Sequence, residues 1–150
     1  MKMAICYYSR HHGNTLKVLN AMAGDDEVSL IDATTRQAVR LDGYDGIGFA
    51  SGIYYGSFHQ SVLQFARQYL PTGKAVFFVF TYGAYRPGYT RAIEQITREK
   101  DCPVMGTFGC KGYDTFGPFK WIGGIAKNHP DAQDLENARQ FYENLLGRGV

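Results

Sequence analysis

Short apolar runs alternate along this chain with segments of helical periodicity, and this alternation constrains the fold more than any other feature. Each run is too short for a helix and suits a strand buried in a sheet. Strands that alternate with helices favour an open parallel sheet with helices on both faces, because each crossover returns the chain to the same end of the sheet. The sequence therefore predicts an α/β fold with a three-layer, doubly wound, five-stranded parallel sheet. The expected strands are Met3–Tyr8, Glu27–Ile31, Tyr44–Ala50, Ala75–Phe80 and Pro103–Phe108.

Four segments between and after these runs place apolar residues at helical spacing. The polar stretch 32–43 supports no assignment, and no linker, internal repeat or low-complexity tract interrupts the chain. With 150 residues, one domain spanning 1–150 is expected. The first helix is expected from about Thr15 to Gly24, and the fourth begins at Pro130. The apolar positions of the first are Leu16, Leu19 and Met22; of the second, Phe58, Val62, Phe65, Ala66 and Tyr69; of the third, Tyr89, Ala92, Ile93 and Ile96; and of the fourth, Leu135, Ala138, Tyr142 and Leu145.

Charge and composition argue against several classes of function. The formal net charge is only +2 and the basic residues are scattered, which argues against a nucleic-acid partner. No apolar run approaches the roughly 18 residues of a membrane span, and no leader pattern is visible, so a soluble, cytoplasmic protein is expected. The three cysteines form no paired motif and the four histidines have no metal-ligand spacing, so we expect no metal site and no catalytic residue.

The segment Ser9–Thr15 leaves the first strand and enters the first helix. In sheets of this type, ligands bind outside the carboxyl ends of the strands. A turn into a helix presents free backbone N–H groups and the positive end of the helix dipole, which together favour an anion. The hydroxyls of Ser9 and Thr15 and the amide of Asn14 add hydrogen-bond donors. Gly13 has no side chain, so the backbone there can come close to the anion. The turn lacks the lysine of a Walker motif, which binds nucleoside triphosphates, and the G-x-G-x-x-G pattern of dinucleotide sites. It therefore suits a phosphate monoester. The alternative is an ordinary polar turn that binds no ligand.

Tyr8-Ser9 through Gly13-Asn14-Thr15 resembles the flavodoxin phosphate loop, [ST]-x-T-G-x-T, and the order of elements resembles the short-chain flavodoxin layout. The resemblance implies the strand order 2-1-3-4-5 and one FMN cofactor. Here the loop is one residue longer than the usual pattern, and two histidines replace its middle threonine. The implied phosphate contacts are Ser9, Gly13, Asn14 and Thr15, with a further donor from His11 or His12.

Two further loops correspond to those that flank the flavin ring in flavodoxins. The segment Ser51–Ser57 follows the third strand and offers aromatic faces beside glycines whose peptides can turn. The segment Thr81–Gly88 follows the fourth strand, and its backbone is expected to read the pyrimidine edge. Which tyrosine stacks on the ring stays open. The implied ring contacts are Gly52, Ile53, Tyr54, Tyr55 and Gly56 in the first loop, and Thr81, Tyr82, Gly83 and Tyr85 in the second.

The long segment Gly109–Pro130 differs most from a minimal flavodoxin. It carries Tyr113, Phe116, Phe119 and Trp121, the only tryptophan in the chain. Long loops in compact domains are usually functional or disordered, and this aromatic content argues against disorder. We expect it either to fold across the flavin edge or, equally, to cap the sheet end or make a dimer contact.

Three functions remain open: an FMN carrier of electrons between redox partner proteins, an NAD(P)H-dependent reductase of quinones or other small acceptors, and a module without cofactor. The loop features disfavour the third. The long aromatic segment and the basic character favour a small-molecule site, whereas the short chain and single domain favour the carrier, which we prefer. The chain is basic, with a pI near 8.4, whereas typical flavodoxins are acidic. A less reducing flavin is therefore expected. A monomer and a homodimer both remain open. The basic residues near the expected site are Arg10, Arg86, Lys111, Lys120 and Lys127.

Overall fold

A computed structural model describes residues 1–10, 12–24, 27–114 and 121–148 of the chain. Five parallel strands form the sheet in the order β2-β1-β3-β5-β6, which confirms the predicted fold class and strand order. The chain runs from β1 outward to β2 and then returns to the other side of β1, so the strand order reverses between β1 and β3. The strands are β1 Met3–Tyr8, β2 Val28–Asp32, β3 Gly46–Tyr54, β5 Ala75–Tyr82 and β6 Val104–Lys111, and a short β4, Ser57–Phe58, pairs antiparallel with β3.

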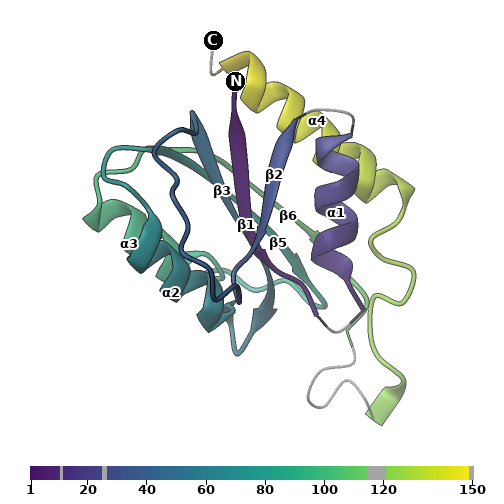
Figure 1. Ribbon diagram of the computed structural model, residues 1–150. Coiled ribbons are helices and arrows are strands. Elements are labelled where there is room, and N and C mark those ends of the chain that lie inside the picture. Colours follow the sequence, from purple (N-terminus) through teal and green to yellow (C-terminus); the bar gives the residue numbers. More distant parts are fainter. Residues whose placement is uncertain (11, 25–26, 115–120, 149–150) are drawn as a thin grey trace.

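Helices cover both faces of the sheet (Figure 1). Helices α1 (Asn14–Ala23) and α4 (Ala132–Arg148) pack on one face, and α2 (Gln60–Tyr69) and α3 (Arg91–Glu99) pack on the other. Because successive side chains of a strand point to opposite faces, Phe77 and Phe78 of β5 enter different cores. None of the helices in the described ranges has the length and apolar character that a bilayer crossing requires.

The third strand is longer than predicted. The sequence predicted a strand ending at Ala50 followed by a loop, whereas β3 continues to Tyr54 and turns back into β4. Tyr55 and Gly56 form the two-residue turn with φ values of 52° and 78°, the left-handed geometry that matches the twist of a tight hairpin. The predicted loop Ser51–Ser57 is therefore mostly a β-hairpin. Phe58 lies in β4 and not in the helix to which its spacing assigned it.

The segment after the fifth parallel strand is also more regular than predicted. Strand β6 continues to Lys111, and a backbone bridge then pairs Asp114 with Ile125. Trp121 is 80% exposed. The expectations for Phe116, Phe119 and Lys120 lie outside the described residues.

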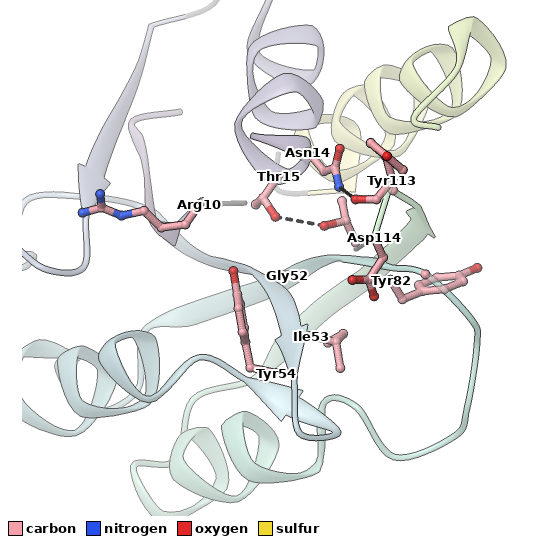
Figure 2. A pocket seen from close by; sticks show the side chains of 12 residues that line it. Arg10, Asn14, Thr15, Gly52, Ile53, Tyr54, Tyr82, Tyr113 and Asp114 are labelled. Atoms are coloured by element: carbon pink, nitrogen blue, oxygen red, sulfur yellow. Dashed lines mark hydrogen bonds between the residues drawn. The ribbon is translucent and has the colours of Figure 1, made fainter. Parts of the chain in front are cut away.

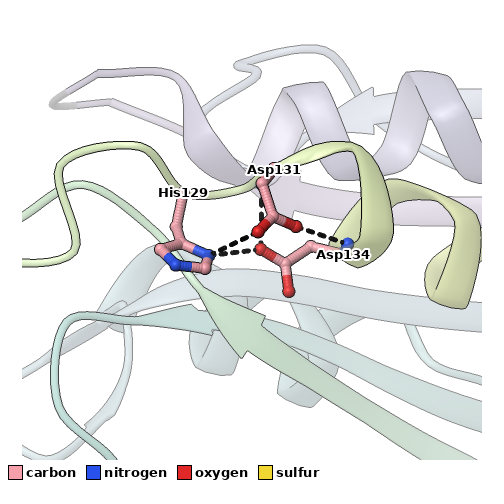
Figure 3. A network of polar contacts seen from close by, with 3 residues as sticks. All are labelled: His129, Asp131 and Asp134. Carbon is pink, nitrogen blue, oxygen red and sulfur yellow. Dashed lines mark hydrogen bonds and ion pairs between the residues drawn. The ribbon is translucent and has the colours of Figure 1, made fainter.

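Helix α4 begins two residues later than Pro130, where the sequence placed its start. Asp131 and Asp134 exchange hydrogen bonds, since each backbone N–H donates to the other residue's carboxylate at 2.9 Å. His129 Nδ1 lies 2.6 Å from Asp134 Oδ2 (Figure 3). Ligand-type atoms of these three residues lie within 4.8 Å of one another. The reciprocal cap of the helix accounts for this grouping.

The contact between β3 and β5 leaves no room for a side chain at Gly48. A Cβ atom there would lie 2.4 Å from Cζ of Phe77. Both residues are buried in the sheet, so we expect Gly48→Ala to lower the free energy of unfolding by about 1–3 kcal/mol. The matched variant Gly43→Ala, where a Cβ would meet nothing within 4 Å, should change it by less than about 0.5 kcal/mol. Urea unfolding measures both, and equal midpoints would contradict this packing.

Candidate functional site

A pocket opens at the carboxyl ends of β1, β3, β5 and β6, beside the point where the strand order reverses (Figure 2). This is the place where open α/β sheets bind ligands. The pocket encloses about 400 Å³, its open mouth included. Its walls come from the carboxyl ends of these strands and from the segments that follow them, because parallel strands bring those segments to one edge. The lining residues are Arg10, Asn14, Thr15, Gly52, Ile53, Tyr54, Thr81, Tyr82, Gly83, Gly112, Tyr113 and Asp114.

One end of the pocket is the start of helix α1. Gly13 caps the helix with a φ of 67°, a conformation that costs a glycine little. The first N–H groups of a helix have no acceptor inside it. The N–H of Leu16 donates to Ser9 Oγ at 3.0 Å, while Asn14 and Thr15 line the pocket. The helix end therefore presents its positive dipole and its first amides to this part of the pocket.

Two side-chain contacts join the start of α1 to neighbouring loops. Asn14 Nδ2 donates to the carbonyl of Tyr113 at 2.7 Å, and Thr15 Oγ1 lies 3.1 Å from Thr81 Oγ1 in a buried contact. Asn14 Oδ1 is buried and has no hydrogen-bond partner among the described residues. A buried acceptor without a donor costs roughly 1–3 kcal/mol. A hydroxyl group of a bound ligand would supply the missing donor.

The other end of the pocket is lined by aromatic and backbone groups. Tyr54, at the end of β3, and Tyr82, at the end of β5, line it from two neighbouring strands (Figure 2). Burial, and then the nearby Tyr8 and Asp114, raise the pKa of Tyr54 to about 12. Burial also raises the pKa of Tyr82. Both phenols therefore stay neutral near pH 7 and present uncharged ring faces and edges to a ligand.

The structure brings together some of the predicted site residues and separates others. Tyr55 is 93% exposed at the hairpin tip, and Tyr85 is 63% exposed and packs edge-on against Tyr82 at 5.5 Å. His12 stacks on Tyr113 at 4.1 Å, and His11 lies outside the described residues. The predicted residues that line the pocket are Asn14, Thr15, Gly52, Ile53, Tyr54, Thr81, Tyr82 and Gly83, whereas Ser9, His12, Gly13, Tyr55, Gly56 and Tyr85 lie outside its lining.

The sequence analysis gave the segment Gly109–Pro130 a place across the flavin edge as one alternative, but it named no contact from the turn that follows β6. Gly112, Tyr113 and Asp114 form one wall of the pocket. A Cβ at Gly112 would lie 2.6 Å from Asn14 Nδ2, so this wall packs directly against the start of α1. The signal was present in the sequence, since a glycine followed by an aromatic and an acidic residue comes directly after the fifth parallel strand.

Arg10 and Asp114 bring opposite charges to the pocket. The sequence prediction included the arginine as one of several basic residues near the site but did not include the aspartate. Asp114 packs closely on the loop after β5, because a Cβ at Gly83 would lie 2.7 Å from its Oδ2. Both charges act on Tyr54, whose pKa Asp114 raises and Arg10 lowers. The local charge is therefore more balanced than the basic composition alone suggested.

Comparison with known proteins agrees with this architecture. The family model described as "Flavodoxin domain" matches residues 4–107. The uncharacterized protein MJ0298 of Methanocaldococcus jannaschii is 34% identical over 148 residues, which cover 97% of this chain and 99% of that protein. A flavodoxin from the domain Archaea superposes with a TM-score of 0.67 at 17% identity, over 99% of each chain. A short-chain flavodoxin associated with a PDU bacterial microcompartment superposes with a TM-score of 0.69 at 14% identity, over all of each chain. With a family match over more than half its length and a relative that matches it from end to end, the chain belongs to the flavodoxin family.

Proposed function

We propose that this protein binds one FMN in the pocket at the carboxyl edge of the sheet and transfers electrons between redox partners. One observation carries the proposal: the pocket joins an anion-favouring helix start at one end to neutral aromatic walls at the other. A flavin mononucleotide has a phosphate at one end and a flat aromatic ring system at the other. The flavodoxin domain match supports a flavin as the ligand.

The chemistry of the residues that line the pocket supports FMN as the ligand. The first amides of α1 and the Thr15 hydroxyl suit the phosphate, which carries up to two negative charges. The unpartnered Asn14 Oδ1 suits a ribityl hydroxyl, and Tyr54 and Tyr82 suit the ring. When bound, the flavin supplies one- and two-electron redox chemistry, while the protein holds it and sets its electrostatic surroundings.

An NAD(P)H-dependent reductase of quinones or other small acceptors is the second candidate. The pocket is open, and Arg10 is an exposed cation in its lining that would attract an anionic substrate. The exposed aromatic side chains of Tyr55 and Tyr85, on two of the loops that build the site, instead suit contact with a partner protein. We therefore favour the carrier.

The phosphate contact is tested by Thr15→Val. Removing a hydroxyl that donates to a charged group costs about 1.5–3 kcal/mol, so FMN should bind roughly 10- to 100-fold more weakly. Riboflavin lacks the phosphate, so its affinity should hardly change. Quenching of flavin fluorescence measures both affinities. Thr97→Val is the matched control, because it removes a buried hydroxyl in α3 that donates to the carbonyl of Glu94. Equal losses for FMN and riboflavin would show that Thr15 does not contact the phosphate.

The effect of charge on the flavin is tested by Arg10→Gln. A positive charge ~8 Å from the flavin, at an effective dielectric near 20, would stabilise the anionic reduced form by roughly 2 kcal/mol. That corresponds to about 90 mV for a one-electron couple. Because Arg10 is exposed and salt screens it, this is an upper limit for the fall in potential that we expect. Arg40→Gln, whose side chain is 89% exposed and pairs with Asp42, is the control. An equal shift in both variants by anaerobic potentiometry would contradict a local effect.

Anaerobic mixing with NADPH distinguishes the two activities. A carrier needs a protein partner to exchange electrons, so the oxidised flavin should keep its absorbance when NADPH alone is added. Rapid bleaching of the flavin in a stopped-flow experiment would identify the reductase instead. If the purified protein is colourless and added FMN does not bind, both activities are ruled out.

A further inference from the structure

Three aromatic side chains from different elements meet behind the ring end of the pocket. The rings of Tyr8, at the end of β1, and His59, before α2, stack with centroids 3.6 Å apart and planes 2° from parallel. Tyr54 lies 5.7 Å from Tyr8 and 5.1 Å from His59, with its plane nearly perpendicular to both. These three distances place Tyr54 beside the stack, at a level between the two rings. On top of the stack, it would lie much farther from one ring than from the other.

His59 is fixed in place by hydrogen bonds at the start of α2. It is the N-cap residue of that helix, and its Nδ1 accepts the backbone N–H of Ser61 at 3.1 Å. Ser61 Oγ also lies 2.8 Å from Nδ1, and the backbone N–H of His59 donates to Ser51 Oγ at 2.9 Å. The cap sets the plane of the imidazole, and the imidazole in turn sets the plane of the Tyr8 ring. Tyr54, which lines the pocket, packs against both.

We propose that His59 is a positioning residue that holds Tyr54 in place for the flavin ring, and that protonation of its imidazole releases this support. The inference rests on the proposed function, because the flavin is the ligand that Tyr54 would contact. The support passes through a series of contacts. The start of α2 orients His59, the rings of His59 and Tyr8 pack against Tyr54, and Tyr54 lines the pocket.

The protonation step follows from the geometry of the cap. A neutral imidazole accepts the Ser61 N–H through the lone pair on Nδ1, whereas a protonated one has no lone pair there and adds a positive charge to the positive end of α2. The groups that face His59 are the phenols of Tyr8 and Tyr54, the hydroxyls of Ser51 and Ser61, and the Arg10 guanidinium above the Tyr8 ring.

The direction of the pH effect follows from the surroundings of the imidazole. Burial, and then Arg10, lower the pKa of His59 below its ordinary value of 6.5. The folded protein therefore favours the neutral imidazole. The support is present above pH 6.5 and is lost as the pH falls through the lowered pKa.

Two variants separate the ring of His59 from its cap. His59→Asn keeps a strong N-cap but removes the ring, and His59→Phe keeps a ring but removes the cap acceptor.

Riboflavin is the probe, because its affinity is free of the phosphate ionisation that FMN has near pH 6. We expect His59→Asn to bind riboflavin about two- to tenfold more weakly at pH 7.5, the range for losing aromatic pair contacts. Wild-type affinity should fall as the pH is lowered below 6.5, and both variants should lose that dependence. Wild-type affinity in His59→Asn, or an unchanged pH dependence in either variant, would overturn the inference.

A second measurement needs no flavin. In the apoprotein, nuclear magnetic resonance follows the titration of the His59 ring protons, and Tyr54→Phe assigns the Tyr54 ring signals. We expect the Tyr54 signals to shift with the midpoint of the His59 titration. Tyr54 signals that stay constant while His59 titrates would overturn the inference even if FMN binds. If the wild type binds neither flavin, the proposed function fails, and this titration still tests whether His59 controls Tyr54.

Discussion

The site depends on the contact between the start of α1 and the loops that follow β5 and β6. Thr15 meets Thr81 through buried hydroxyls, and Asn14 donates to the carbonyl of Tyr113. Neither contact is local, since 66 residues separate the first pair and 99 separate the second. The same residues face the pocket, so the groups that tie the loops together are also those available to a ligand. Binding of a phosphate at this point would therefore add to contacts that the fold already makes.

The turn after β6 gives the pocket its remaining wall and one of its two charges. Tyr113 makes three hydrogen bonds that hold this turn in place. Its carbonyl accepts from the Asn14 side chain, its N–H donates to the carbonyl of His129, and its hydroxyl donates to the carbonyl of Gly123. The last two of these bonds join Tyr113 to the residues that precede α4. Gly112, Tyr113 and Asp114 of the long segment before α4 line the pocket, and a fold of that segment across the flavin edge stays a prediction. Asp114 opposes the positive charge of Arg10, which composition alone would not reveal.

The fold could be predicted because its signals are local and repeated. Apolar runs such as Ala75–Phe80 suit only a strand buried on both faces, and their alternation with helices leaves few topologies. The errors in strand bounds are largest at the carboxyl ends, where β3, β5 and β6 continue beyond their predicted runs. These extensions mix Ile53 and Cys110 with glycine, polar and aromatic residues, so they form no continuous apolar run. Pairing with a neighbouring strand keeps them extended. Periodicity carries no information about that neighbour.

The sequence by itself determined the class of fold, because hydrophobic runs and helical periodicity are short-range patterns. The strand order was implied by the resemblance to flavodoxins, and the phosphate contact at the first turn stays a prediction. Only the tertiary structure decided which side chains share the pocket. It placed Tyr54 and Tyr82 in the lining while leaving Tyr55 and Tyr85 exposed, and it brought His59 behind Tyr54. Such choices depend on the hairpin turn, on strand register and on packing between distant segments, and these are properties of the assembled sheet.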